Sequence, residues 1–251
     1  QDSADCWAHP TIRRRDARLG VPPDDFPATG QDWGLPYFDF VAMQKDDYAW
    51  LKARAKKAAS YYDLRRVDHA VGYFRQWIRD EQTPTGRFIP PDEESHKRLG
   101  RKHFELLSEG AGIVAEDLGV IPPFVRHILA ELKLPGYRVM RWERDDNTYR
   151  NPHQFPAISL VTTGTHDTDT LVEWWEGARD DERQAAARAW PELNGVPVSR
   201  EFTPEVHRAL LAAALNSGSD LCVLPWQDVL GTRDRINLPG SMSDSNWAYR
   251  I

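Results

Sequence analysis

Short apolar runs alternate with longer amphipathic segments along most of the chain. The longer segments carry apolar residues at helical spacing, and they cover residues 46–60, 95–109, 122–132 and 203–216. The short runs are rich in Val, Ile, Tyr and Thr, and each is followed by polar residues, so we expect them to be strands. These expected strands cover residues 61–67, 111–115, 136–140, 158–163 and 221–224.

Alternating strands and helices favour a parallel sheet, either open or closed into a barrel. In both arrangements the functional side chains gather where strands end and loops begin. Four acidic residues occupy such positions, namely Asp68, Glu116, Asp167 and Asp228. Because loops are generally polar, their position alone does not define a site.

The composition is typical of a soluble globular protein. The chain has 251 residues, of which 41% are hydrophobic and 28% charged, and its 10 Trp, 8 Tyr and 9 Phe supply core material that disordered chains lack. The longest apolar run, residues 209–215, is far shorter than the roughly 20 residues of a membrane-spanning helix. A net charge of −6 argues against nucleic acid or an anionic membrane as the main partner.

The cysteines indicate a reducing compartment. Cys6 and Cys222 lie far apart and form neither a disulfide framework nor a metal-ligand spacing. No secretory hydrophobic segment opens the chain, so we expect a cytoplasmic location. The sequence also has no Gly-rich phosphate loop and no metal-ligand cluster, so neither a cofactor nor a metal is expected. The oligomeric state is left open.

Arg66 and Asp68 are two residues apart on an expected strand, so their side chains point to the same side. A neighbouring guanidinium favours the ionised form of a carboxyl group. An ionised aspartate can attack an electrophilic carbon as a nucleophile. The competing interpretation, which the spacing alone favours, is a structural ion pair at the end of a strand.

Glu116 follows a buried-looking apolar run at residues 112–115. Burial raises the pKa of a carboxyl group and lets it hold a proton near neutral pH, which suits a general acid. Asp117 should face the other way. It fits a capping or salt-bridging role better, because it lies closer to the turn at residues 119–123.

His166 and Asp167 follow the expected strand at residues 158–163. They could bind sugar hydroxyls, bind a metal, or cap a helix that begins near Asp169. Without further His or Cys at ligand spacing, a metal is the least favoured of the three.

An ionised carboxylate paired with a protonated one is the combination used to break glycosidic bonds. The charged group attacks the anomeric carbon, and the neutral group protonates the leaving oxygen. Aromatic residues suit a sugar ligand, although most Trp and Tyr side chains are expected in the core. Trp33, in the sequence QDWG, is a better candidate for a sugar platform than Trp50, which lies in a helical pattern.

A series of short segments gives the chain a family resemblance. Each segment is weak evidence alone, but they follow one another in the order found in the 4-alpha-glucanotransferases of the amylomaltase type, which the chain resembles. They are residues 3–10 (SADCWAHP), 20–34 (GVPPDDFPATGQDWG), 66–69 (RVDH), 115–121 (AEDLGVI), 134–136 (LPG), 163–167 (TGTHD), 227–228 (QD), 235–240 (RINLPG) and 246–247 (NW).

The resemblance implies an α/β fold, a (β/α)8 TIM barrel of the alpha-amylase type, and a retaining mechanism acting on alpha-1,4-glucans and maltooligosaccharides. It assigns Asp68 as the nucleophile, Glu116 as the acid/base, and Asp167 as the carboxylate that orients the reacting sugar. Arg66 and His166 match family residues of the same subsite, and both are expected to bind substrate together with Trp33.

The chain departs from the family pattern in its loops. Many members have Phe-Arg-Gly after Asp-His, whereas residues 70–75 here read AVGYFR, and Thr168 stands where Asn is common. Both differences concern acceptor preference more than the chemical step.

The chain also departs in length. Family members are about twice as long, and a barrel needs eight strands, of which five are expected here. With no initial Met, the chain is expected to be the C-terminal part of such a barrel, about strands 4–8. Residues 1–60 would form an insertion after the third strand, and residues 61–251 would form the C-terminal part of the catalytic barrel. Five strands cannot close, so unpaired edges are expected.

Three functions remain open from the sequence. The first is transfer of alpha-1,4-glucan segments, and the second is hydrolysis or debranching by a relative that uses the same residues. The third is a catalytically silent carbohydrate-binding fragment, because three strands and their loops are absent. What separates transfer from hydrolysis is how well acceptor sugars compete with water.

Overall fold

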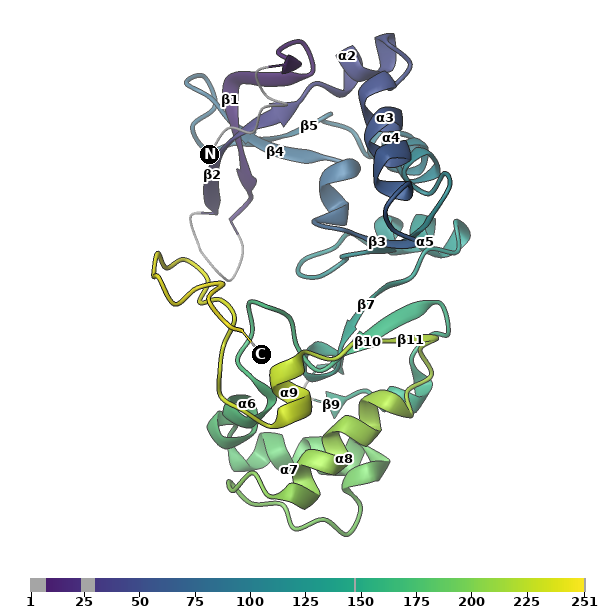
Figure 1. Ribbon diagram of the computed structural model, residues 1–251. Coiled ribbons are helices and arrows are strands. Elements are labelled where there is room, and N and C mark those ends of the chain that lie inside the picture. The colour runs from purple at the N-terminus through teal and green to yellow at the C-terminus, as the bar shows by residue number, and fades with distance from the viewer. Residues whose placement is uncertain (1–7, 24–29, 147, 251) are drawn as a thin grey trace. The chain divides into compact units, whose positions relative to one another are not determined.

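The chain folds into two compact units, Gln1–Gly136 and Tyr137–Ile251. The computed structural model describes residues 8–23, 30–146 and 148–250, and Figure 1 shows the elements of both units. Each unit has its own hydrophobic core. Cys6 and parts of the resemblance segments at residues 3–10 and 20–34 lie outside the described residues.

The first unit contains an antiparallel sheet with the strand order β2-β1-β4-β5. Its strands are β1 (Arg13–Val21), β2 (Gln31–Phe38), β4 (Gln76–Arg79) and β5 (Arg87–Ile89). The buried side chain of Gln76 extends the backbone pairing, because its amide accepts from the Phe38 nitrogen and donates to the Phe38 oxygen, both at 2.8 Å. The sequence did not predict this sheet.

The same unit contains a parallel pair, β3 (Leu64–Val67) and β6 (Gly112–Ala115), aligned from Leu64 opposite Gly112 to Val67 opposite Ala115. These strands confirm two of the five sequence predictions. Helices pack around the pair and the core, and those at residues 49–59, 93–107 and 123–131 confirm predicted helices. The helical elements are α2 (Phe40–Lys45), α3 (Ala49–Ala59), η1 (Ala70–Tyr73), α4 (Glu93–Leu107) and α5 (Pro123–Glu131).

Arg65 of β3 forms hydrogen bonds with two of these helices. Its guanidinium donates to the carbonyl oxygens of Ala55 in α3 (2.8 Å) and Leu107 in α4 (2.6 Å). Leu107 is the last residue of α4, where backbone acceptors lack helical partners. The arginine therefore fixes the strand that carries the neighbouring Arg66 and Asp68.

His103 of α4 makes the stability of this unit sensitive to acid. The imidazole is fully buried, donates from Nδ1 to the Tyr73 oxygen (2.7 Å), and packs against Phe40 and Tyr48. Burial lowers the pKa of His103 from its ordinary 6.5 to about 4. Between these values the unfolded chain binds a proton that the folded chain does not, so stability is lost as pH falls from about 6.5 to about 4.

We therefore expect acid to destabilise this unit by about 3 kcal/mol through His103. Urea unfolding at a series of pH values would measure this loss, and it should be largely absent in His103→Leu. His127→Gln, which changes an exposed histidine of α5, serves as the control and should keep the full pH dependence. An unchanged dependence in His103→Leu would contradict the assignment.

The second unit contains strands in the order β11-β10-β7, and β7 (Gly136–Val139) begins at the boundary residue. With β10 (Ser159–Thr162) and β11 (Leu221–Cys222), it confirms the remaining predicted strands, and β10 and β11 are parallel. A short hairpin and several helices complete the unit: η2 (Met140–Trp142), β8 (Arg144–Asp145), β9 (Thr148–Tyr149), η3 (Pro152–Gln154), α6 (Leu171–Gly177), α7 (Asp180–Ala189), η4 (Pro191–Leu193), α8 (Pro204–Leu215) and α9 (Trp226–Leu230).

Helix caps define two starts in this unit. Thr203 caps α8 by accepting from the Val206 nitrogen, as the Thr-Pro sequence predicted. Thr170 caps α6 and forms a capping box with Glu173, so the helix begins two residues after Asp169. The cap is therefore Thr170, and neither His166 nor Asp167 has that role.

Tryptophans form much of the second core. Trp175 and Trp190 are almost completely buried, and their indole nitrogens donate to the oxygens of Ser199 (3.0 Å) and Arg150 (3.1 Å). This agrees with the expectation that many aromatic residues are core residues. Among the described helices, none has both the length and the apolar character needed to cross a bilayer.

Candidate active site

The parallel pairing of β3 and β6 brings Asp68 and Glu116 to the same end of neighbouring strands. Val67 lies opposite Ala115, and each catalytic candidate is the next residue along its strand. The Glu116 nitrogen donates to the Val67 oxygen (2.9 Å), and the Ala70 nitrogen donates to the Glu116 oxygen (3.0 Å). The backbone therefore sets the position of one carboxyl group relative to the other.

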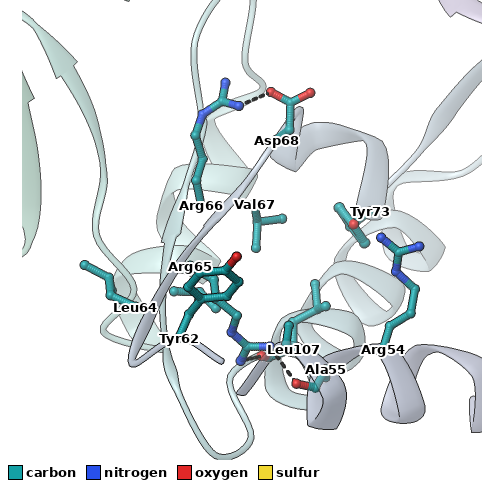
Figure 2. Close-up of a pocket in the computed structure, with 12 residues that line it drawn as sticks. Arg54, Ala55, Tyr62, Leu64, Arg65, Arg66, Val67, Asp68, Tyr73 and Leu107 are labelled. Carbon is teal, nitrogen blue, oxygen red and sulfur yellow. Dashed lines mark hydrogen bonds and ion pairs between the residues drawn. The ribbon is translucent and has the colours of Figure 1, made fainter. Parts of the chain in front are cut away.

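Arg66 and Asp68 form the ion pair that their spacing predicted. Nη1 of Arg66 lies 2.6 Å from Oδ1 of Asp68, as Figure 2 shows. The Asp68 side chain is 72% exposed. An exposed pair stabilises a fold by at most about 1 kcal/mol, so the structural interpretation explains little of this arrangement. The pair leaves a charged carboxylate open to a ligand.

Glu116 lies in a different environment. Its carboxyl group is half-buried, and its two oxygens accept from the backbone nitrogens of His69 (2.7 Å) and Leu118 (3.0 Å). Burial raises the pKa of Glu116, and the negative charge of Asp68 raises it further, while the two backbone hydrogen bonds and Arg66 oppose the shift. The sequence predicted this direction. Two neighbouring carboxyl groups thus differ in environment as an acid and a nucleophile require.

Asp117 has the structural role predicted for it. Its carboxylate is buried and accepts from Nε of Arg126 in α5 at 3.1 Å. A side chain at position 136 would place its Cβ 2.7 Å from both Asp117 oxygens, so the glycine of the Leu-Pro-Gly segment leaves room for this carboxylate.

Trp33 of β2 contacts His69, the residue that follows Asp68 in the chain. Its ring meets the His69 ring edge-on, with centroids 5.0 Å apart and planes at 77°, and it remains 37% exposed. The His69 backbone is left-handed (φ 48°), and burial lowers its imidazole pKa. A Cβ at Gly72 would lie 2.7 Å from the His69 ring. Although the sequence of this loop departs from the family pattern, Gly72 therefore leaves the space that the ring needs.

A cavity of about 540 Å³ lies next to Asp68. Figure 2 shows Asp68 and Arg66 at one end and Tyr62, Arg65 and Leu107 at the other. Glu116 does not line the cavity, so this space by itself does not define where both carboxyl groups would meet a substrate.

The second unit carries His166 and Asp167 on a tight loop after β10. Thr168 closes the loop: its Oγ1 donates to the Thr165 oxygen and accepts from the Thr165 nitrogen, both at 3.0 Å. A Cβ at Gly164 would lie 2.5 Å from this hydroxyl, so a side chain at this position would displace Thr168. Thr168, which departs from the family pattern, therefore acts on the shape of the loop.

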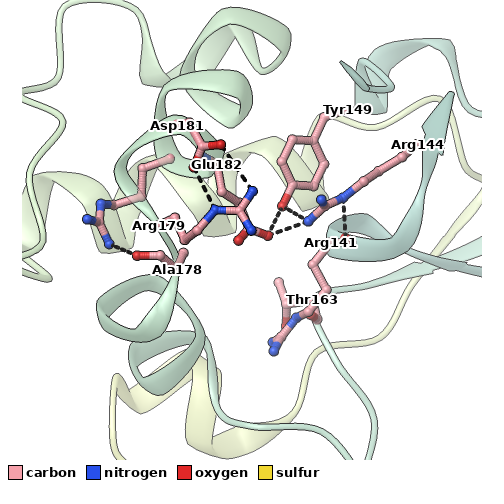
Figure 3. A network of polar contacts seen from close by, with 9 residues as sticks. Arg141, Arg144, Tyr149, Thr163, Ala178, Arg179, Asp181 and Glu182 are labelled. Carbon is pink, nitrogen blue, oxygen red and sulfur yellow. Dashed lines mark hydrogen bonds and ion pairs between the residues drawn. The ribbon is translucent and has the colours of Figure 1, made fainter. Parts of the chain in front are cut away.

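Arg141 holds both ends of this loop. The buried guanidinium donates to the Thr163 oxygen (2.9 Å) and the Asp169 oxygen (3.0 Å). Figure 3 shows the polar network beside it, in which Arg144 contacts the Arg141 oxygen, the Tyr149 hydroxyl and Glu182. Sequence reasoning did not identify this network, because none of its members stands beside the loop in the chain.

Asp167 receives contacts on both carboxylate oxygens. Nε2 of His166 lies 3.1 Å from Oδ2, and Nδ2 of Asn237 donates to Oδ1 at 2.6 Å. The side chain is 46% exposed and borders a cavity of about 460 Å³, which Trp142 and Arg141 also line. Sequence reasoning assigned no role to Asn237, although it lies in the RINLPG segment that carried the resemblance.

Asp228, the remaining acidic residue at a strand end, has a structural role. It is almost completely buried, and its oxygens accept from Oγ1 of Thr163 (2.5 Å) and the Leu171 nitrogen (2.7 Å) at the start of α6. Within the described residues, no three His, Cys, Asp or Glu side chains come together as a candidate metal site.

The structure thus places the six predicted site residues in two groups. The first unit carries Arg66, Asp68 and Glu116 together with Trp33. The second unit carries His166 and Asp167 in contact with each other. Asp68, Glu116, His166 and Asp167 follow the ends of parallel strands, as the sequence predicted, whereas Arg66 lies within β3 and Trp33 lies in β2 of the antiparallel sheet.

The family model and the curated relatives that match this chain carry the same description. The family model described as 4-alpha-glucanotransferase matches residues 1–251. A 4-alpha-glucanotransferase of Thermus thermophilus is 35% identical over 269 residues, covering 100% of this chain and 52% of the relative. One from Chlamydia pneumoniae is 33% identical, covering 100% of this chain and 49% of the relative. The chain spans about half the length of the curated relatives it matches.

Solved structures share the fold. The amylomaltase of Streptococcus agalactiae, determined in complex with acarbose, superposes with a TM-score of 0.82 at 24% identity, covering 100% of this chain and 51% of that one. The amylomaltase of Corynebacterium glutamicum gives a TM-score of 0.80 at 24% identity, covering 98% and 40%. The fold is therefore that of the corresponding part of these amylomaltases.

Proposed function

Because the chain belongs to the 4-alpha-glucanotransferase family over its whole length, we propose that it carries the catalytic residues for transfer of alpha-1,4-glucan segments between maltooligosaccharides. The observation that carries the proposal is the pair of neighbouring carboxyl groups in the first unit. Asp68 is exposed and paired with Arg66, whereas burial raises the pKa of Glu116. This division matches the two roles of a retaining mechanism.

In the first step, Asp68 attacks the anomeric carbon of the donor sugar while Glu116 gives its proton to the leaving glycosidic oxygen. The bond from the anomeric carbon to that oxygen breaks as the bond to the Asp68 carboxylate forms, leaving a covalent glycosyl-enzyme. The two carboxyl groups of a retaining enzyme lie about 5–5.5 Å apart, and we propose this separation for Asp68 and Glu116.

In the second step, the 4-hydroxyl of an acceptor sugar replaces the aspartyl oxygen at the anomeric carbon. Glu116, now ionised, takes the proton of that hydroxyl, and Asp68 leaves as a carboxylate. We propose that Asp167 and His166 bind hydroxyls of the donor sugar, that Arg66 also binds substrate, and that Trp33 offers its exposed face as a platform.

The finer architecture is part of the same proposal. The chain would supply about strands 4–8 of a (β/α)8 barrel, with residues 1–60 as an insertion and residues 61–251 as the C-terminal part of the barrel. Parallel strands in both units and the amylomaltase likeness support this. A cytoplasmic location and the absence of nucleic-acid or membrane partners stay predictions from composition.

Incubation of the purified chain with maltotriose tests the function. Transfer predicts glucose together with a ladder of maltooligosaccharides longer than the substrate. Hydrolysis would yield only shorter products and would favour the hydrolase alternative. Maltotriose binding without either product, measured by calorimetry, would favour the silent carbohydrate-binding alternative for this chain.

A further inference from the structure

The RINLPG segment (residues 235–240) lies against the His166–Asp167 loop, although about 70 residues separate them in sequence. Two of its side chains contact Asp167 and Asp169. Nδ2 of Asn237 donates to Oδ1 of Asp167 at 2.6 Å. Arg235 donates to the Asp167 backbone oxygen at 3.1 Å and pairs with the Asp169 carboxylate. The segment thus forms hydrogen bonds with both the backbone and the side chain of Asp167.

The segment is itself held in shape by the residues that follow it. The Trp247 nitrogen donates to the Ile236 oxygen (2.7 Å), and the Leu238 nitrogen donates to Oδ1 of Asn246 (3.1 Å). The Trp247 ring lies against the His166 ring, with centroids 5.1 Å apart. The NW pair therefore connects the RINLPG segment to the other residue that contacts Asp167.

An exposed aspartate would otherwise sample several rotamers. Its two oxygens contact Nδ2 of Asn237 and Nε2 of His166, and these contacts restrict its torsion angles. A carboxylate offers about four acceptor sites, so about two stay available for sugar hydroxyls. The bond from Asn237 is charge-assisted and short, which is the stronger kind of hydrogen bond. This contact therefore positions Asp167 without blocking it.

We propose that Asn237 is a positioning residue that sets the orientation of Asp167 toward the reacting sugar. The inference rests on the proposed role of Asp167 in glucan transfer. Hydrogen bonds to a sugar hydroxyl that strengthen in the transition state depend on the geometry of the carboxylate. Misplacing it should therefore lower kcat while leaving substrate affinity nearly unchanged.

The variants Asn237→Ala and Asn237→Asp test the proposal by their transfer kinetics with maltotriose. We expect Asn237→Ala to lower kcat on the order of 10–100-fold, with KM changed by less than about threefold. Asn237→Asp keeps the size of the side chain but replaces the donor with a like charge, so it should be at least as slow. Its deficit relative to the unsubstituted protein should shrink as pH falls and the introduced carboxyl group becomes a donor.

Asn216→Ala is the matched control, because it removes another amide-to-carboxylate hydrogen bond, to Glu192, outside the cavity beside Asp167. It should leave kcat unchanged. Wild-type kcat in Asn237→Ala, or a fall in activity that follows thermal stability and shows no recovery of Asn237→Asp at low pH, would overturn the proposal.

A spectroscopic measurement decides the contact independently of turnover. In NMR spectra of the chain, we expect the Asn237 side-chain amide proton to lie downfield and to be protected from exchange, and both features should disappear in Asp167→Ala, which removes the acceptor oxygen. If they are absent from the unsubstituted chain, the positioning proposal fails. If they are present while Asp167→Ala transfers glucan normally, the proposed function of Asp167 fails instead.

Discussion

Replacing Asp68 with asparagine is expected to lower the rate of glucan transfer on the order of 10⁴-fold or more. The amide cannot form the glycosyl ester, so the two-step route is lost. The fold should be unaffected, because the Asp68 side chain is 72% exposed and its ion pair with Arg66 lies at the surface. Product formation from maltotriose and a urea unfolding curve of the same preparation would measure both expectations.

Asp16→Asn provides a matched control for this variant. Asp16 pairs with Arg14 at 2.8 Å, two residues away in the chain, so it reproduces the Arg-X-Asp arrangement away from the parallel strand ends. It should retain full transfer activity. If Asp68→Asn lost no more activity than Asp16→Asn, the Arg66–Asp68 pair would be a structural feature and the nucleophile would lie elsewhere.

Replacing Glu116 with glutamine is expected to lower transfer from maltotriose on the order of 10²–10⁴-fold. The variant cannot protonate the leaving glycosidic oxygen or deprotonate the acceptor hydroxyl. A glycosyl fluoride donor needs little acid assistance, so the first step should be far less affected with it than with maltotriose. Glu131→Gln, which alters a surface carboxylate of α5, should keep normal rates with both donors.

The pH profile gives a second test of Glu116. Burial raises its pKa, so the protonated form needed for the first step persists to higher pH than for an ordinary glutamate. The rate constant kcat/KM should therefore fall as pH rises through this raised pKa, and the alkaline limb should vanish in Glu116→Gln. An unaltered alkaline limb in the variant would assign it to another group.

The parallel strands and their helices were predictable because the signal is local. The runs of β6 and β10 are mostly apolar and buried, as expected of parallel strands, and helical spacing marked α4, α5 and α8. The β3 sequence LRRV is mixed, and only Val67 in it is buried. The antiparallel sheet was not predictable in this way. The β1 sequence RRRDARLGV is mostly polar, and β4 pairs with β1 across more than fifty residues, so tertiary pairing determines these strands.

In the candidate site, too, the features with a local sequence signal were predictable and those set by tertiary contacts were not. Arg66 and Asp68 could be paired from strand periodicity, and the burial of Glu116 followed from the apolar run before it. The contacts around Asp167 could not be inferred, because Asn237 and Arg141 come from distant parts of the chain. Thr168 looked like a departure from the family, yet its hydroxyl closes the loop through hydrogen bonds that only the folded structure reveals.

Trapping the covalent intermediate tests the central claim most directly. The Glu116→Gln variant, incubated with maltosyl fluoride, should form the glycosyl-enzyme without acid assistance and then accumulate it, because no base activates the acceptor. Peptide mass spectrometry should find the added maltosyl group on Asp68, and Asp68→Asn should abolish the adduct. Attachment to Asp167 or another residue, or the absence of any adduct while fluoride is still released, would contradict the assignment of Asp68 as the nucleophile.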